Sequence, residues 1–235
     1  MKVFVGTSGY DYKEWKGEFY PEDTRSKDLL RAYSERLEAV EVNNTFYHMP
    51  TERILKSWIQ QVPEDFVFAV KSSRRITHIK RLKDVEQETE YLFRTLSLLG
   101  RRLGPVLFQF PRNLSVKPER LAPFLELLPE EPLCAFAFRS PSAPGDDVLG
   151  LLREKRCALC LEDTDESPVE AIVSTANWGY LRLRRSDYTD VDLKQWAERI
   201  LLQNWDRAFV FLKHEEEARS ALNAVRFREI VEGML

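Results

Sequence analysis

Eight short apolar runs recur along the chain, and the segments between them are long enough to hold helices. The runs lie at residues 3–5, 39–43, 66–71, 105–110, 133–138, 157–161, 179–183 and 208–212. Short apolar runs that alternate with helical segments are typical of parallel strands covered on both faces. Eight such strands predict an α/β fold of the (β/α)8 TIM-like barrel type. An open doubly wound sheet shows the same alternation but usually has fewer strands, so we favour the barrel.

Helical spacing of apolar residues between the runs predicts a helix after most strands. Four of these helices are expected at residues 28–36, 117–128, 147–155 and 215–232. A further helix should open at Asp84, whose carboxylate is a suitable N-cap. Two others should bury, respectively, Ile54, Leu55, Trp58 and Ile59, and Leu193, Trp196, Ala197, Ile200 and Leu201. The stretch 164–174 follows neither period, and no linker or repeat interrupts residues 1–235, so we expect one domain.

The formal net charge of -3 predicts no bulk attraction to nucleic acid or membrane surfaces, so any anion site requires a local cluster of cations. No run approaches the roughly 20 apolar residues of a membrane span. Residues 1–5 enter a strand pattern at once, which is unlike a signal peptide. We therefore expect a cytoplasmic protein without a membrane segment.

The three cysteines are an odd number, which argues against a disulfide framework. Cys157 and Cys160 form a C-x-x-C pair, which fits a redox motif or half of a zinc site. In a strand, however, positions three apart point to opposite faces, so buried apolar cysteines are the favoured interpretation. The three histidines, His48, His78 and His214, lie in separate loops without metal-ligand spacing. We expect no metal site.

Polar side chains collect where the apolar runs end, which is the end of a barrel that carries function. These residues are Thr7, Ser8, Glu41, Asn43, Lys71, Gln109, Arg139, Glu162, Asp163, Arg182, Arg184, Lys213 and His214. Polar groups at the end of a buried strand cost stability unless they are paired or solvated in a cleft. The sequence therefore predicts a polar site at the carboxyl ends of the strands.

Several motifs together resemble the DUF72 (YecE-like) family of barrel proteins. They are GTSG at 6–9, FYP at 19–21, VEVNNTFY at 40–47, FVFAVK at 66–71, TH at 77–78 and GPVLFQFP at 104–111. The resemblance implies a TIM-barrel-like fold, and it implies no particular activity because the function of that family is not established. It covers essentially the whole chain and is most specific up to Pro111.

The C-terminal half departs from the family pattern. Where the family has Glu-Phe-Arg-His, this chain keeps Arg139 in the sequence AFRS, and the histidine of Tyr-x-Arg-x-His is replaced by Arg184 after Tyr180 and Arg182. An expected Asn pair is replaced by Leu212 and Lys213. Acid-base groups are lost and positive charges are gained, so we expect this site to favour anions.

Glu41 and Lys71 fall on neighbouring strands, which suggests a general base beside an electrostatic stabiliser. A structural ion pair closing the top of the barrel remains an equally open interpretation. Lys71 as a Schiff-base amine is chemically possible. Ligand-binding candidates are Asn43, Tyr47, His78, Gln109, Arg139, Arg182 and Arg184.

Arginines suit phosphate and carboxylate geometry, so an anionic, phosphate-bearing small molecule is the expected partner. Acid/base chemistry of the hydrolase or lyase type is then the first functional hypothesis. The alternative is a non-catalytic module that binds nucleic acid or protein through a basic mouth. The aromatic series Tyr10, Tyr12, Trp15, Phe19 and Tyr20 fits a stacking lid or, as we favour, a packed loop. The sequence indicates no cofactor and no oligomeric state.

Overall fold

The computed structural model describes residues 1–140, 143–213 and 218–235. Eight parallel strands pair in chain order and close into a barrel, which confirms the (β/α)8 prediction. The strands are β1 (Lys2–Ser8), β2 (Ala39–Val42), β3 (Val67–Lys71), β4 (Leu103–Gln109), β5 (Cys134–Ala137), β6 (Ala158–Asp163), β7 (Trp178–Leu183) and β8 (Arg207–Leu212). Every neighbouring pair is parallel, so all carboxyl ends meet at one end of the barrel, which we call the mouth.

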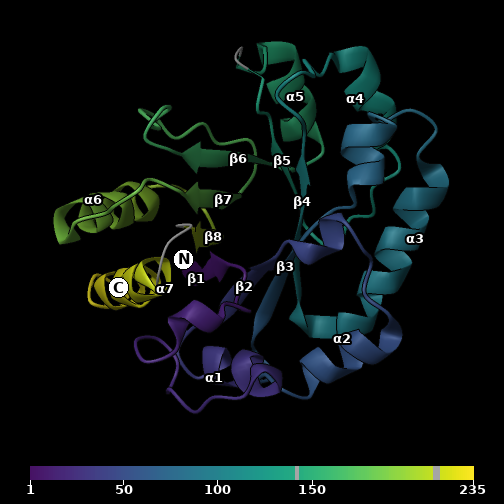
Figure 1. Cartoon of the computed structure of the whole chain (residues 1–235). Helices are drawn as coiled ribbons and strands as arrows, with labels where there is room; N and C mark the ends of the chain where they lie inside the picture. The colour runs from purple at the N-terminus through teal and green to yellow at the C-terminus, as the bar shows by residue number, and fades with distance from the viewer. Residues whose placement is uncertain (141–142, 214–217) are drawn as a thin grey trace.

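Helices surround the strands on the outside, with α1 and α2 below, α3 on the right, α4 and α5 above and α6 and α7 on the left in Figure 1. They are α1 (Leu29–Ser34), α2 (Glu52–Ile59), α3 (Glu86–Leu96), α4 (Pro118–Leu125), α5 (Asp146–Glu154), α6 (Asp190–Leu201) and α7 (Arg219–Glu232). Shorter turns add η1 (Lys13–Trp15), η2 (Ser26–Asp28), η3 (Asn44–Phe46), η4 (Arg75–Ile79) and η5 (Ser97–Arg102). In the described part of the chain, every helix is too short or too polar to cross a membrane.

The barrel interior is apolar below the mouth. Phe4 and Phe209 stack with their ring centroids 4.9 Å apart, and Tyr180 and Phe211 lie 5.4 Å apart at a tilt. Small inward residues such as Ala69, Ala135 and Ala137 leave space for these rings. Bulky and small side chains thus fill the lower barrel as a packed core, and the polar groups are left to the mouth.

Two details of the predicted helices were wrong. Asp84 does not cap α3, because the chain there has a φ of +49° and the helix begins only at Glu86. Ile54 is 40% exposed rather than inward. In α2 the apolar stripe comprises Leu55, which is fully buried, and Trp58 and Ile59, which are partly buried about one turn further on, and Ile54 lies just outside it. The final helix begins at Arg219, and the predicted start at Glu215 lies outside the described residues.

The irregular stretch after β6 holds no helix and is fixed by hydrogen bonds to the barrel. The Asp163 carboxylate accepts from the Val169 amide at 2.9 Å, and Arg199 donates to the Val169 carbonyl at 2.9 Å. Thr175 accepts from the Leu159 amide and donates to the Cys157 carbonyl, each at 2.7 Å. Hydrogen bonds to β6, to α6 and to the Cys157 carbonyl therefore fix this segment, which has no helix of its own.

The aromatic loop packs instead of forming an open lid, as favoured from the sequence. Trp15, Phe19 and Tyr20 are buried and contact one another edge to face or at a tilt. Phe19 also packs on Tyr33 of α1 at 5.9 Å, and the Tyr12 hydroxyl donates to the Ser8 carbonyl at 2.9 Å. The loop therefore closes the barrel wall beside β1.

A phenol also joins β1 to β2. The Tyr33 hydroxyl accepts from the Thr7 amide and donates to the Ala39 carbonyl, each at 2.8 Å. Gly6 leaves the space for this contact, because a methyl group on it would overlap the Ala39 carbonyl. The spacing of these two strands thus depends on Tyr33 and Gly6.

Candidate functional site

Polar residues occupy the uppermost inward position of the strands around the mouth. Side chains alternate between the two faces of a strand, so each of these residues lies two positions beyond an apolar inward residue. The set comprises Ser8, Glu41, Lys71, Gln109, Arg139, Glu162 and Arg182. The sequence prediction of a polar end is thereby confirmed, and contacts across the barrel show that several of these groups meet.

Glu41 is fully buried, and both of its carboxylate oxygens are occupied. Oε1 accepts from Arg182 at 2.9 Å, from Ser8 at 2.7 Å and from Asn43 at 3.1 Å. Oε2 accepts from the Tyr180 hydroxyl at 2.7 Å. Four donors, from β1, β7 and the residue that follows β2, thus hold one carboxylate in place at the centre of the mouth.

Arg182 spans the barrel from β7. Its second guanidinium nitrogen, Nη1, donates to Gln109 at 2.8 Å and to Glu162 at 2.5 Å. Because Nη2 binds Glu41, one buried guanidinium joins two carboxylates and an amide from three other strands. Charge-assisted bonds in such a planar fork have fixed geometry, so Arg182 sets the shape of the mouth.

Glu162 gathers the arginines that lie nearer to solvent. Arg139 forms a two-pronged contact with its oxygens at 2.9 and 3.0 Å, and Arg184 approaches to 3.4 Å. Burial alone would raise the pKa of Glu162, but Arg182 and Arg139 lower it to about 2. Glu162 is therefore ionised at neutral pH and orients three guanidinium groups.

The charge pair at the centre stays ionised in the same way. Burial would raise the pKa of Glu41, but Arg182 and the hydrogen bonds from Tyr180 and Ser8 bring it below its usual value. The pKa of Arg182 is raised by Glu41 and Glu162, although burial opposes this. A saturated carboxylate with a low pKa is a weak base. The geometry favours the structural ion pair over the general base, and the partner of Glu41 is Arg182 instead of Lys71.

Lys71 lies beside this network at the end of β3. Its ammonium sits 4.1 Å from the ring centroid of Phe46, and the ring of His78 meets the same phenylalanine edge to face at 4.8 Å. Burial and then Arg182 lower the pKa of Lys71 to about 8. Burial and then Lys71 lower the pKa of His78 to about 4, so this imidazole is neutral at pH 7.

The other predicted ligand-binding residues have different surroundings. Asn43 and Gln109 point into the network as donors and acceptors for Glu41 and Arg182. Tyr47 lies at the rim, 63% exposed, with its ring against Phe46. His214 lies outside the described residues.

The sequence placed Ser8 and Glu162 among the polar strand ends but gave them no role, and Tyr180 was not predicted as a site residue. Their position along the strand is the signal that identifies all three. Each of them shares the inward face of its strand with apolar residues of the barrel core, and this parity can be read once the strand ends are known. Phe46, which supports both Lys71 and His78, carries no comparable signal.

Among the described residues of this network, positive charge exceeds negative charge. Lys71, Arg139, Arg182 and Arg184 carry four positive charges, and Glu41 and Glu162 carry two negative ones. The pKa of Arg184 is also lowered, first by burial and then by the neighbouring charge of Arg182. An anion placed among these side chains would be stabilised by the uncompensated charge.

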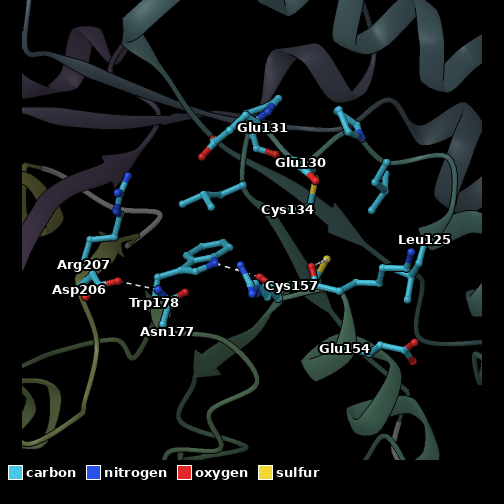
Figure 2. A pocket seen from close by; sticks show the side chains of 16 residues that line it. Leu125, Glu130, Glu131, Cys134, Glu154, Cys157, Asn177, Trp178, Asp206 and Arg207 are labelled. Atoms are coloured by element: carbon cyan, nitrogen blue, oxygen red, sulfur yellow. Dashed lines mark hydrogen bonds between the residues drawn. The ribbon is translucent and has the colours of Figure 1, made fainter.

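A cavity of about 620 Å³ opens at the opposite end of the barrel, away from this network. Figure 2 shows Cys134, Cys157 and Trp178 along its wall, with Glu131 and Arg207 at its edge. The thiols of all three cysteines are free and buried, which confirms the favoured interpretation of the C-x-x-C pair, and burial raises the pKa of Cys157 to about 12. We regard the mouth as the site because barrel enzymes use this end and because the ordered charges lie there.

Metal ligands do not gather in the part of the chain that the structure describes, where no three His, Cys, Asp or Glu side chains are placed to share an ion. His48 is exposed in the loop after η3, and His78 bonds through Nδ1 to the Thr77 hydroxyl at 2.8 Å. The donors around Lys71 are cations and amides, which suit an anion better than a metal ion.

Comparison with known proteins places this geometry in a family. A family model described as "Protein of unknown function DUF72" matches residues 4–234. The UPF0759 protein YunF of Bacillus subtilis is 31% identical over 51% of this chain and 44% of its own length. The UPF0759 protein YecE of Escherichia coli K12 is 32% identical over 43% of this chain and 38% of its own length, so the chain matches less than half of either relative.

A solved structure of a DUF72 family protein is similar to this chain over almost its full length. The crystal structure of a DUF72 family protein from Thermotoga maritima covers 99% of this chain and 100% of its own, with a TM-score of 0.86 and 25% identity. The barrel, the matched family model and this structural similarity agree. The chain therefore belongs to the DUF72 family.

Proposed function

We propose that the barrel binds a small anionic ligand, bearing a phosphate or carboxylate group, at its mouth. The observation that carries this proposal is the excess of positive charge among the described side chains at the mouth. Burial is the largest cause of the lowered pKa values of Lys71, His78 and Arg184, and the neighbouring cations lower them further. A bound anion would relieve that repulsion and raise all three pKa values.

Arg139 and Arg184 are the proposed anion holders. Their side chains are 30% and 18% exposed, so they can reach a ligand without leaving the network, whereas that of Arg182 is only 3% exposed. Glu162 holds both in place, and within the described residues each arginine keeps further donors that can meet the oxygens of a ligand. Arg182 and Glu41 then act as positioning residues that fix Glu162 and Gln109.

Acid/base chemistry of the hydrolase or lyase type is the finer part of the proposal. Lys71 and His78 are the groups best suited to it. The pKa of Lys71 is lowered toward neutrality, that of His78 is lowered below it, and both side chains contact the Phe46 ring. Glu41 was the base expected from the sequence. We now assign it to anchoring, since four donors already occupy it.

A non-catalytic module that binds nucleic acid or protein is the competing proposal. Such a surface needs cations spread over an open face. Here the cations converge inside the barrel, and Arg75, one of the basic loop residues, pairs on the outside with Glu88 at 2.8 Å. This arrangement favours a small ligand over an extended polyanion.

Calorimetric titration with inorganic phosphate and small phosphorylated or carboxylated compounds tests the proposal. We expect Arg139→Ala and Arg184→Ala to weaken binding at least about tenfold, since a charge-assisted hydrogen bond contributes about 1.5–3 kcal/mol. Arg207→Ala is the matched control, because this arginine lines the cavity at the other end. The Arg207→Ala variant should bind these anions with the same affinity as the unaltered protein. Equal weakening by all three variants would argue against a site at the mouth.

The same titration separates the two classes of ligand. A small anion should bind with a weak dependence on salt, because few counterions are released. Binding only to oligonucleotides, with affinity that falls steeply as salt rises, would favour the nucleic-acid module. No binding by any anion would remove the proposed function.

A further inference from the structure

Lys71 has an unusual setting for a lysine. It occupies the inward position at the end of β3, where its backbone carbonyl accepts from the Thr45 hydroxyl at 2.7 Å. Its side chain is held over the Phe46 ring at 4.1 Å. The amine is therefore fixed in the mouth instead of extending into solvent.

The carboxylates that would normally pair with this amine are already occupied. Glu41 and Glu162 are bound by arginines, and within the described parts of the chain no carboxylate lies in ion-pair distance of the Lys71 amine. Lys80 and Lys155, by contrast, contact Glu88 and Glu126 at 2.9 and 2.8 Å. Among the described residues, Lys71 is thus a fixed amine without an acidic partner.

Two cations and two carboxylates face it: Arg182 of β7 and Arg139 after β5, and Glu41 of β2 and Glu162 of β6, both of which are bound by arginines. His78 of η4, neutral at pH 7, borders the same phenylalanine ring. Burial is the largest cause of its low pKa, and Arg182 is the next. With a pKa of about 8, about half of the amine is neutral at pH 8, whereas an ordinary lysine is almost fully protonated there. A lysine beside other cations in a desolvated site is an activated nucleophile.

We propose that Lys71 is a catalytic nucleophile that forms an imine with an aldehyde or ketone carrying a phosphate or carboxylate group. The proposal deepens the anion-binding function above and depends on it, because the arginines would hold the anionic group while the amine reaches the carbonyl.

The step balances without any further reagent. The lone pair of the Lys71 nitrogen attacks the carbonyl carbon, and the carbonyl π electrons move to oxygen. The two amine protons then leave with that oxygen as one water molecule, and a carbon–nitrogen double bond takes the place of the carbon–oxygen double bond. His78, neutral at pH 7 and against the same phenylalanine, can accept and return a proton during the transfer.

Reductive trapping tests the inference. The protein is incubated with glyoxylate, dihydroxyacetone phosphate or uncharged glycolaldehyde in the presence of cyanoborohydride, and each lysine is followed by peptide mass spectrometry. We expect the Lys71 peptide to gain the adduct at least tenfold faster than that of Lys56, which is exposed and paired with Glu52. The rate at Lys71 should rise between pH 6 and pH 9 with a midpoint near 8.

Three variants make the test specific. Lys71→Arg keeps the positive charge but removes the primary amine, so it should lose the adduct. Arg139→Ala should slow trapping of the two anionic probes more than that of glycolaldehyde, which reports only the change in the amine itself. Arg207→Ala, at the opposite end, should change neither reaction.

The outcomes distinguish the inference from the function beneath it. Phosphate binding that is abolished by Arg139→Ala, together with trapping at Lys71 no faster than at Lys56, would overturn the imine and leave the anion site standing. Fast trapping at Lys71 with no preference for anionic probes, together with no phosphate binding, would overturn both the anion site and the imine substrate proposed here.

Discussion

Replacing Arg182 by leucine should destabilise the protein by about 3–5 kcal/mol, because it leaves Glu41 charged and buried without its ionic partner. Arg182 binds Glu41 at 2.9 Å and Glu162 at 2.5 Å, and Glu41 is fully buried. The free energy of unfolding, measured by urea titration at pH 7, reports the loss. The effect is large because the Glu41 carboxylate remains buried after the guanidinium of Arg182 is removed.

A double-mutant cycle separates the pair from other losses. Glu41→Gln together with Arg182→Leu should cost less than the sum of the single changes, by about 1–3 kcal/mol, because no buried charge is then left alone. Arg226→Leu is the matched control, since that arginine makes its ion pair with Asp190 on the exposed surface of α7. It should leave the unfolding midpoint nearly unchanged. Additive losses at Glu41 and Arg182 would contradict the pairing.

Gly6→Ala should cost about 3 kcal/mol, the upper part of the usual range, since overpacking against rigid backbone is relieved only by moving the strands apart. The added methyl group would overlap the Ala39 carbonyl of β2 and lie close to the Tyr33 hydroxyl. Both strands carry groups of the mouth, Ser8 on β1 and Glu41 on β2, so we also expect weaker anion binding. Urea titration and calorimetry on the same preparation measure the two effects.

Gly150→Ala is the matched control for this change. Gly150 lies inside α5, and a methyl group on it would meet no atom within 4 Å. Alanine is the better helix former by about 0.8–1.0 kcal/mol, so the control should stabilise the protein slightly. If Gly6→Ala left the unfolding midpoint unchanged, the close approach of β1 to β2 would not be as tight as described.

The barrel could be predicted from the sequence because its signal is repeated. Each of the eight apolar runs corresponds to a strand, and the polar end of the barrel followed from the residues at which the runs stop. Parity within a strand depends only on local geometry, so Glu41, Lys71 and Gln109 could be placed in the mouth without any tertiary information. The boundaries were less certain, and Asp84 shows why. Asp84 has a positive φ, as do Arg81 and Leu82 in the same turn before α3, and residue type alone does not indicate this conformation.

The partners within the mouth could not be predicted, because they lie far apart along the chain. Glu41 and Arg182 are separated by 141 residues, and their contact depends on barrel closure and register. The sequence therefore suggested Lys71 as the partner of Glu41, simply because β2 and β3 are neighbours. The sequence also does not show how deeply a side chain is buried. The lowered pKa of Lys71 could therefore be inferred only from its buried position in the structure, beside Phe46 and Arg182.

One measurement tests the central claim, that the mouth of the barrel is an anion site, most directly. Crystals soaked with tungstate, an electron-dense mimic of phosphate, would locate bound anions by anomalous scattering. We expect the strongest peak between Arg139 and Arg184, near Lys71, and its loss in Arg139→Ala crystals. A strongest peak beside Arg207 in the opposite cavity, or peaks only on the outer surface, would contradict the claim.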